Sequence, residues 1–180
     1  MSEVNKNRLE VQKIIRDVIL LGIEKMNLGN WDVMEFANAS FQKADKIVLM
    51  HLLRTSRVGW QSHYYATIDE QFSRVESYTE EQTWQIHSIC KRTDNTTVDD
   101  VLAEDMASRL ITWFNGPGMD ELRKRYVAPL RVDTDSILVY TDNSDFYQKR
   151  AVFTVKIQVP KELAFGEFEA ESIMPKIMPI

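Results

Sequence analysis

KRAVFTVKIQVP, residues 149–160, is the stretch of this chain that decides its fold. Its apolar side chains recur at every second position, as Ala151, Phe153, Val155, Ile157 and Val159. The positions between them are polar apart from Val152. Because successive side chains of a strand point to opposite faces, this alternation predicts a long strand. One face of it should be buried, and the other should be open to water or to another subunit.

Length and charge limit the kind of protein that this chain can be. A chain of 180 residues is long enough for one domain whose core needs no disulfide or metal. The formal net charge of -5 argues against a protein that wraps nucleic acid, because that binding needs a concentrated basic face. The one cysteine, Cys90, has apolar neighbours and is expected to be a buried structural thiol. Residues 3–16 are too charged for a signal peptide or a membrane span, so we expect folding in the cytosol.

Two amphipathic helices are expected. Apolar side chains recur at helical spacing in residues 5–26 and again in residues 98–114. Thr97 is the expected N-cap of the second helix, and the sequence Asn-Gly-Pro-Gly at residues 115–118 should end it. A short helical stretch is expected at residues 119–126.

Seven strands are expected, at residues 46–55, 60–69, 72–78, 82–92, 130–132, 137–140 and 149–160. The first should be buried on both faces and followed by a tight reversal near Gly59, and the third and fourth should join around Thr79 and Glu80. Residues 30–45 should form an irregular connection. The predicted fold class is therefore α+β: a mostly antiparallel sheet with an N-terminal helix and a second amphipathic helix packed on it, plus an extended C-terminal arm.

The predicted arm follows a single α+β domain of residues 1–160 and comprises residues 161–180. Its apolar side chains are interrupted by glycine and proline, so it is not expected to be regular core. We expect it to dock on its own domain or on a neighbouring subunit. The candidate interface residues of the arm are Phe165, Phe168, Ile173, Met174, Ile177 and Met178.

The histidines are the first candidates for a catalytic or metal site. His51, His63 and His87 fall on three different expected strands. Their spacing fits no short metal motif and no ordered set of other ligands accompanies them, so we interpret them as structural histidines. Four carboxylates that lie within two turns of the second predicted helix are interpreted as a solvated helix face: Asp99, Asp100, Glu104 and Asp105. We expect no catalytic residue, cofactor or metal, and a small metal-dependent hydrolase is the least favoured alternative.

A basic cluster is the densest positive charge in the chain and is a candidate contact patch, formed by Arg123, Lys124, Arg125 and Arg131. Such a patch can contact a phosphate backbone or an acidic partner. We favour a solvated face or an intersubunit salt bridge. The aromatic side chains of residues 60–84 are interpreted as cross-strand packing pairs rather than as platforms for bases.

Three segments carry a resemblance to a known family. They are RVESYTEEQTWQIHSICKR (residues 74–92), AEDMASRLITWFNGPG (103–118) and VYTDNSDFYQKRAVFTVKIQVP (139–160). Together with the order of elements, they resemble the neck or tail terminator proteins of tailed bacteriophages, over most of residues 5–160. The resemblance implies an α+β subunit of a ring, commonly hexameric, that terminates the tail and joins it to the head connector.

The resemblance also implies partners and a location. The partners would be other copies of the chain, connector or adaptor proteins, and tail or tail-tube proteins. Genomic DNA would pass through the lumen without sequence-specific binding, and an acidic lumen suits this because like charges avoid phosphate contacts. The protein would be part of the virion, assembled in the host cytoplasm, with no membrane partner. A head-side adaptor ring that binds the portal is the alternative position.

Overall fold

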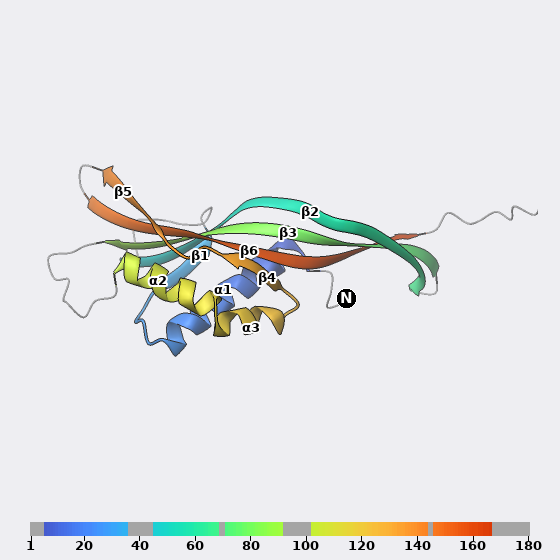
Figure 1. Ribbon diagram of the computed structural model, residues 1–180, viewed down its shortest axis with the longest axis horizontal. Coiled ribbons are helices and arrows are strands. Elements are labelled where there is room, and N and C mark those ends of the chain that lie inside the picture. Colours follow the sequence, from blue (N-terminus) through green and yellow to red (C-terminus); the bar gives the residue numbers. More distant parts are fainter. Residues whose placement is uncertain (1–5, 36–44, 69–70, 92–101, 144–145, 167–180) are drawn as a thin grey trace, which may run out of the picture.

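The computed structural model describes residues 6–35, 45–68, 71–91, 102–143 and 146–166. In this part of the chain the elements are α1 (Arg8–Lys25), β1 (Asp32–Glu35), β2 (Lys46–Ile68), β3 (Gln71–Lys91), α2 (Ala103–Phe114), α3 (Pro117–Arg123), β4 (Ala128–Val132), β5 (Ile137–Asn143) and β6 (Phe146–Gly166). The strands form one sheet, and the three helices lie on one of its faces (Figure 1). The predicted α+β class, with the N-terminal helix first, is confirmed.

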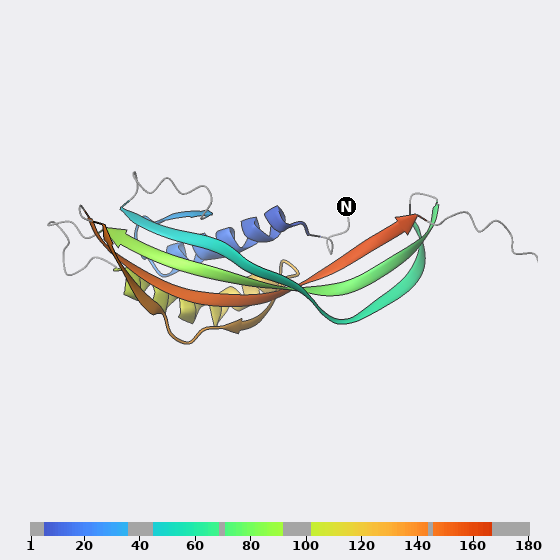
Figure 2. The ribbon, with the colours of Figure 1, turned by 90° about the horizontal axis from the view of Figure 1, so that it is seen from above.

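The sheet is built around three very long strands. Its order is β1-β2-β3-β6-β4, and β5 pairs with β6 as well. β1 runs parallel to β2, and all other pairs are antiparallel. β2, β3 and β6 have 23, 21 and 21 residues, whereas a typical strand has about 5–6. These three strands run from one end of the molecule to the other (Figure 2).

The predicted reversal at Gly59 is wrong. β2 continues through this residue, and its register with β3 shifts between Val58 and Ser62. Gly59 has φ +86°, a left-handed conformation that glycine adopts without strain. A bulge and a turn both place glycine in such a conformation, so the sequence signal is the same for the two.

β3 is also one strand where two were predicted. It pairs with β6 without interruption from Ser73 to Lys91, straight through Thr79 and Glu80. The four strands predicted between residues 46 and 92 are therefore two. β6 likewise extends past both ends of the predicted strand, and its last residues, 161–166, remain paired with β3.

Smaller differences concern β1 and the helices. Part of the segment predicted to be irregular is β1, which pairs with the start of β2. α2 begins at Ala103, and the predicted cap Thr97 lies outside the described residues. α2 ends at Phe114, as predicted. α3 starts at Pro117, because proline suits the first turn of a helix, where its missing N–H is not needed.

The core lies between the helices and one face of the sheet. Its central side chains from the long strands are Val48, Met50, Trp84, Ile86, Phe153 and Val155. The ring of Phe153 packs against Phe114 of α2, with ring centroids 6.4 Å apart. A small second cluster, Ile47, Leu49 and Ile89, lies on the other face. Cys90 is buried, with 6% of its surface exposed, as predicted.

Candidate subunit interface

The outer part of the sheet extends beyond the helices. β2, β3 and β6 continue there as three paired strands, over residues 62–68, 71–77 and 162–166 (Figure 2). We call this extension the bare arm. Neither hydrophobic cluster of the described residues includes a residue of the bare arm. The clustered core of the domain is therefore built from residues outside the bare arm.

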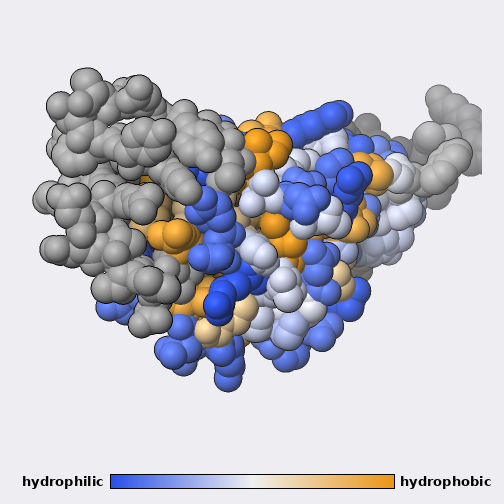
Figure 3. Space-filling model, turned by 60° about the vertical axis from the view of Figure 1, so that its left-hand side comes forward, coloured by the Kyte–Doolittle hydropathy of each residue, from blue (hydrophilic) through white to orange (hydrophobic). Residues whose placement is uncertain are grey.

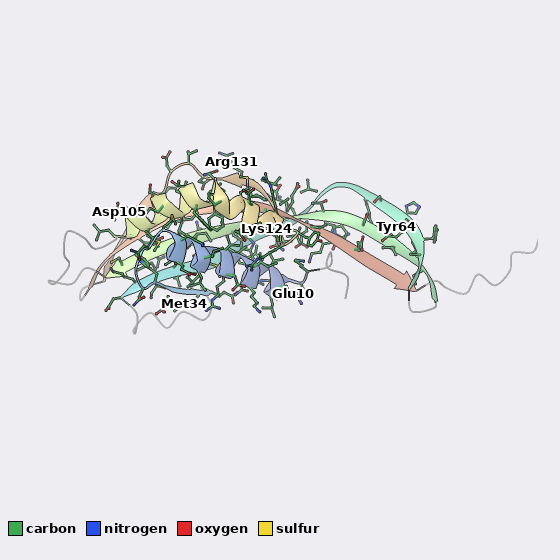
Figure 4. The ribbon with its side chains drawn as sticks, turned by 90° about the horizontal axis from the view of Figure 1, so that it is seen from below. Glu10, Met34, Tyr64, Asp105, Lys124 and Arg131 are labelled. Carbon is green, nitrogen blue, oxygen red and sulfur yellow. The ribbon has the colours of Figure 1, made fainter. Side chains whose placement is uncertain are left out.

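One face of the bare arm is bridged by a hydrogen bond from β2 to β6. The hydroxyl of Tyr64 on β2 donates to Glu162 Oε1 on β6, 3.3 Å away, across the middle strand β3. Val75, the register partner of Tyr64, is only 2% exposed. The pKa of Tyr64 is raised, mainly by desolvation and to a smaller extent by the negative charge of Glu162. Tyr64 nevertheless stays 45% exposed and lies far from the helices (Figure 4).

The opposite face of the bare arm is more exposed and is anchored at its base. Tyr65 is 53% exposed and meets His63 edge to face, with ring centroids 6.3 Å apart. At the base, the Arg57 guanidinium lies 4.4 Å from the centroid of the Tyr78 ring. The Lys161 ammonium donates to the backbone carbonyl of Lys6, just before α1. These contacts tie the base of the arm to the domain.

Both edges of the bare arm are open among the described residues. β1 pairs with β2 only as far as Met50, and β4 pairs with β6 only as far as Gln158. A long unpaired edge presents a row of N–H and C=O groups to which another chain can add a strand. The arm is therefore the part of the described molecule best suited to hold a neighbouring chain.

Exposed apolar side chains also concentrate on β2. The large exposed ones of the described residues are Leu9, Leu53, Val58, Tyr64, Tyr65, Tyr126, Leu130 and Ile137. Half of them belong to β2. On the face seen in Figure 3, by contrast, small apolar patches are separated by hydrophilic side chains. Tyr64 and Tyr65 were predicted to form cross-strand packing pairs, and their exposure of 45% and 53% was not predicted. The signal that could have found them is a strand segment, SHYYATI, with no charged residue, glycine or proline.

The predicted basic patch is split between two elements. Arg123, Lys124 and Arg125 lie at the end of α3, whereas Arg131 lies in β4. The first three form ion pairs with Asp120, Glu121 and Asp17, at 3.3, 2.7 and 3.2 Å. The hydrogen bond between Lys124 and Glu121 raises the pKa of the lysine and lowers that of the glutamate. Local acids thus balance much of the positive charge, and contact of this patch with a partner stays a prediction.

Of the predicted interface residues of the arm, the described part of the chain includes only Phe165, whose backbone belongs to β6. The other five lie outside the described residues: Phe168, Ile173, Met174, Ile177 and Met178. Their role in an interface stays a prediction.

The three histidines lie on two strands and not on three. His51 and His63 both belong to β2, and twelve residues of strand separate them by about 40 Å. His87 lies on β3, is 7% exposed, and its Nε2 lies 3.0 Å from Gln85 Oε1. Burial, then the charges of Arg150 and His51, lower the pKa of His87 to about 4. Among the described residues, no three His, Cys, Asp or Glu side chains are grouped to hold a metal ion.

His87 should make the protein less stable in acid. Its pKa is about 4 in the folded protein and about 6.5 in an unfolded chain. Above pH 6.5 both states carry a neutral ring. Between pH 6.5 and 4 only the unfolded state takes up the proton, so the free energy of unfolding decreases as the pH is lowered. This group contributes at most about 1.4 kcal/mol per pH unit to that decrease.

Urea unfolding between pH 4 and 7 measures this effect. His87→Gln is expected to show a shallower decline than the unmodified protein over this range. Thr112→Ala, on the exposed side of α2, is the control and should keep the original slope. Equal slopes for His87→Gln and the unmodified protein would contradict the assignment.

None of the described helices has the length and apolar character needed to cross a membrane. In a comparison with known families, a family model described as "E217 gateway protein gp29" matches residues 10–165, which is most of the chain. A search of the curated proteins found no match.

Proposed function

Since the chain belongs to the E217 gateway protein gp29 family, a bacteriophage family of the head-tail connector type, we propose that it forms a homo-oligomeric ring at the phage neck. The chain is a structural virion protein of the head-tail junction. In our proposal the ring terminates the tail, joins it to the head connector and leaves a channel for DNA. A hexamer is the expected size.

The observation that carries this proposal is the bare arm with its open edges. A monomer that exposed such edges would invite uncontrolled aggregation. Head-to-tail contacts around a closed ring would cover them, because each subunit then offers one surface and receives the complementary one. The net charge of -5 supports the passage of DNA, since an acidic lumen would not bind the phosphates. In this proposal the protein acts by its shape and has no catalytic role.

Native mass spectrometry of the purified chain over a range of concentrations tests ring formation, and negative-stain imaging shows whether the centre is open. We expect a discrete ring that appears alone or when the neighbouring neck proteins are added. A strictly monomeric chain under both conditions would contradict the proposal.

A head-side position is the second candidate, and the connector type of the family favours it. In that position the ring would bind the portal as an adaptor. Co-assembly experiments with each axial partner separate the two positions. Binding to tail-tube protein supports the terminator position, whereas binding to portal or adaptor proteins alone supports the head-side position.

A further inference from the structure

The outer edge of β2 in the bare arm is a regular acceptor for an added strand. Residues 62–68 pair with β3 without a register shift, from Ser62 opposite Ser77 to Ile68 opposite Gln71. Every second residue of this segment therefore presents its N–H and C=O groups outward at a regular interval. The segment contains no proline, and its β-branched and aromatic residues favour strands. The corresponding edge of β6, residues 162–166, is shorter than the edge of β2.

A matching donor follows β6 directly in the sequence. Residues 167–174, EFEAESIM, begin with alternating acidic and non-acidic residues and contain no lysine or arginine. Glu167, Glu169 and Glu171 would share one face of a strand, and Phe168 and Ala170 the other. The acceptor segment, residues 62–68, contains no lysine, arginine, aspartate or glutamate, so main-chain pairing and not charge would hold the donor.

The position of Gly166 favours a second copy as the donor. This last residue of β6 lies opposite Ser73 of β3, which in turn lies opposite Ala66 of β2. The chain thus leaves the bare arm level with the acceptor, but on the far edge. A strand added to its own β2 would lie three strand spacings away, or about 14 Å. Crossing that distance would use about four residues before any pairing began.

We propose that residues 167–174 of one copy add a strand to the outer edge of β2, at residues 62–68, in the neighbouring copy. This inference rests on the proposed ring and names the contact that closes it. Main-chain hydrogen bonds would supply the attachment. Repeating the contact from copy to copy links the arms head to tail around the ring.

Disulfide crosslinking between two differently sized subunits tests the contact. One subunit carries Ala170→Cys. The other carries a cysteine at one position of the β2 edge: His63, Tyr64, Tyr65 or Ala66. All four side chains are at least partly exposed. Opposed residues on one face of neighbouring strands have Cβ atoms about 5 Å apart, close enough for a disulfide.

We expect a crosslinked heterodimer whose yield alternates along β2, high for one of the sets 63/65 and 64/66 and low for the other. The control partner is Thr112→Cys, exposed on α2, which should give only background crosslinking. The native Cys90 is buried and present in all subunits, so the chain without added cysteines measures its contribution. Yields that equal the Thr112→Cys background, or that do not alternate, overturn the inference.

Deletion of residues 167–180 separates this contact from the ring itself. If the full chain forms a ring and the deleted chain does not, the inference is supported. A ring from the deleted chain overturns the inference and leaves the proposed function standing. Failure of the full chain to form a ring, even with its axial partners, overturns both.

Discussion

Trp113→Ala is expected to lower the free energy of unfolding by about 3–5 kcal/mol, which is the usual cost of truncating a buried tryptophan to alanine. Trp113 of α2 is 7% exposed, and its indole Nε1 donates to the Val18 carbonyl of α1, 3.0 Å away. The same ring contacts two glycines. A Cβ built on Gly22 would lie 2.8 Å from the indole, and one on Gly118 would lie 2.6 Å from it. All three helices therefore meet at this one side chain.

Urea unfolding measures the loss, and Thr112→Ala is the matched control, expected to stay within about 0.5 kcal/mol of the unmodified protein. Gly22→Ala should also destabilise the chain, because its methyl group has no room beside the indole. In the Trp113→Ala background the same methyl group faces a cavity and should cost little. Strict additivity of Gly22→Ala and Trp113→Ala would contradict this packing, since residues in contact are expected to couple.

The sequence predicted the elements whose periodicity is local and clear. α1 and α2 followed from helical spacing, the end of α2 from the Asn-Gly-Pro-Gly stop, and β6 from the unbroken alternation after Lys149. α3 begins at Pro117, two residues before the short helix that was predicted. β2 and β3 were each divided into two, because Gly59 and the polar run around Thr79 are typical of turns. Pairing on both sides overrides these signals in β3, since each residue there has a partner on β2, on β6 or on both.

The candidate interface was harder to predict than the fold. Alternation in residues 149–160 indicated a strand, but it does not say which neighbours that strand has or where their helical cover ends. Pairing of β3 with β6 joins Ser73 to Gly166, far apart in the sequence. The ion pair of Arg125 with Asp17 is equally distant in sequence, so its neutralising effect on the basic patch was not visible. By contrast, the pair of Lys124 with Glu121 is local and could have been read from the sequence.

The structure also changes where a deletion should begin. Residues 161–180 were predicted to form one peripheral arm, yet residues 161–166 pair with β3. Removing them would leave the β6-side edge of β3 in the bare arm without its partner, in addition to removing the proposed donor. A deletion that starts after Gly166 keeps β6 intact, so its effect on assembly can be attributed to the residues that follow.

Replacing residues 59–78 by Asn-Gly is expected to abolish ring formation while the domain still folds. Val58 and Thr79 are register partners, so a two-residue turn can join them directly. The change removes the hairpin of the bare arm, including the proposed acceptor edge, but none of the residues of the two hydrophobic clusters. Cooperative thermal unfolding should therefore persist, and native mass spectrometry should show no ring. As a control outside the arm, Ile137→Ser changes an exposed side chain of β5 and should still assemble.

Mixing this shortened chain with the chain that lacks residues 167–180 gives the sharper result. The shortened chain keeps the proposed donor and lacks the acceptor, whereas the other chain keeps the acceptor and lacks the donor. A head-to-tail contact needs one of each, so the mixture can form one intact contact per pair and no more. We therefore expect a heterodimer in the mixture, monomers from either chain alone, and no ring in any sample. Homodimers of either chain would instead indicate a self-complementary contact, and a ring from either chain would show that other surfaces suffice for assembly.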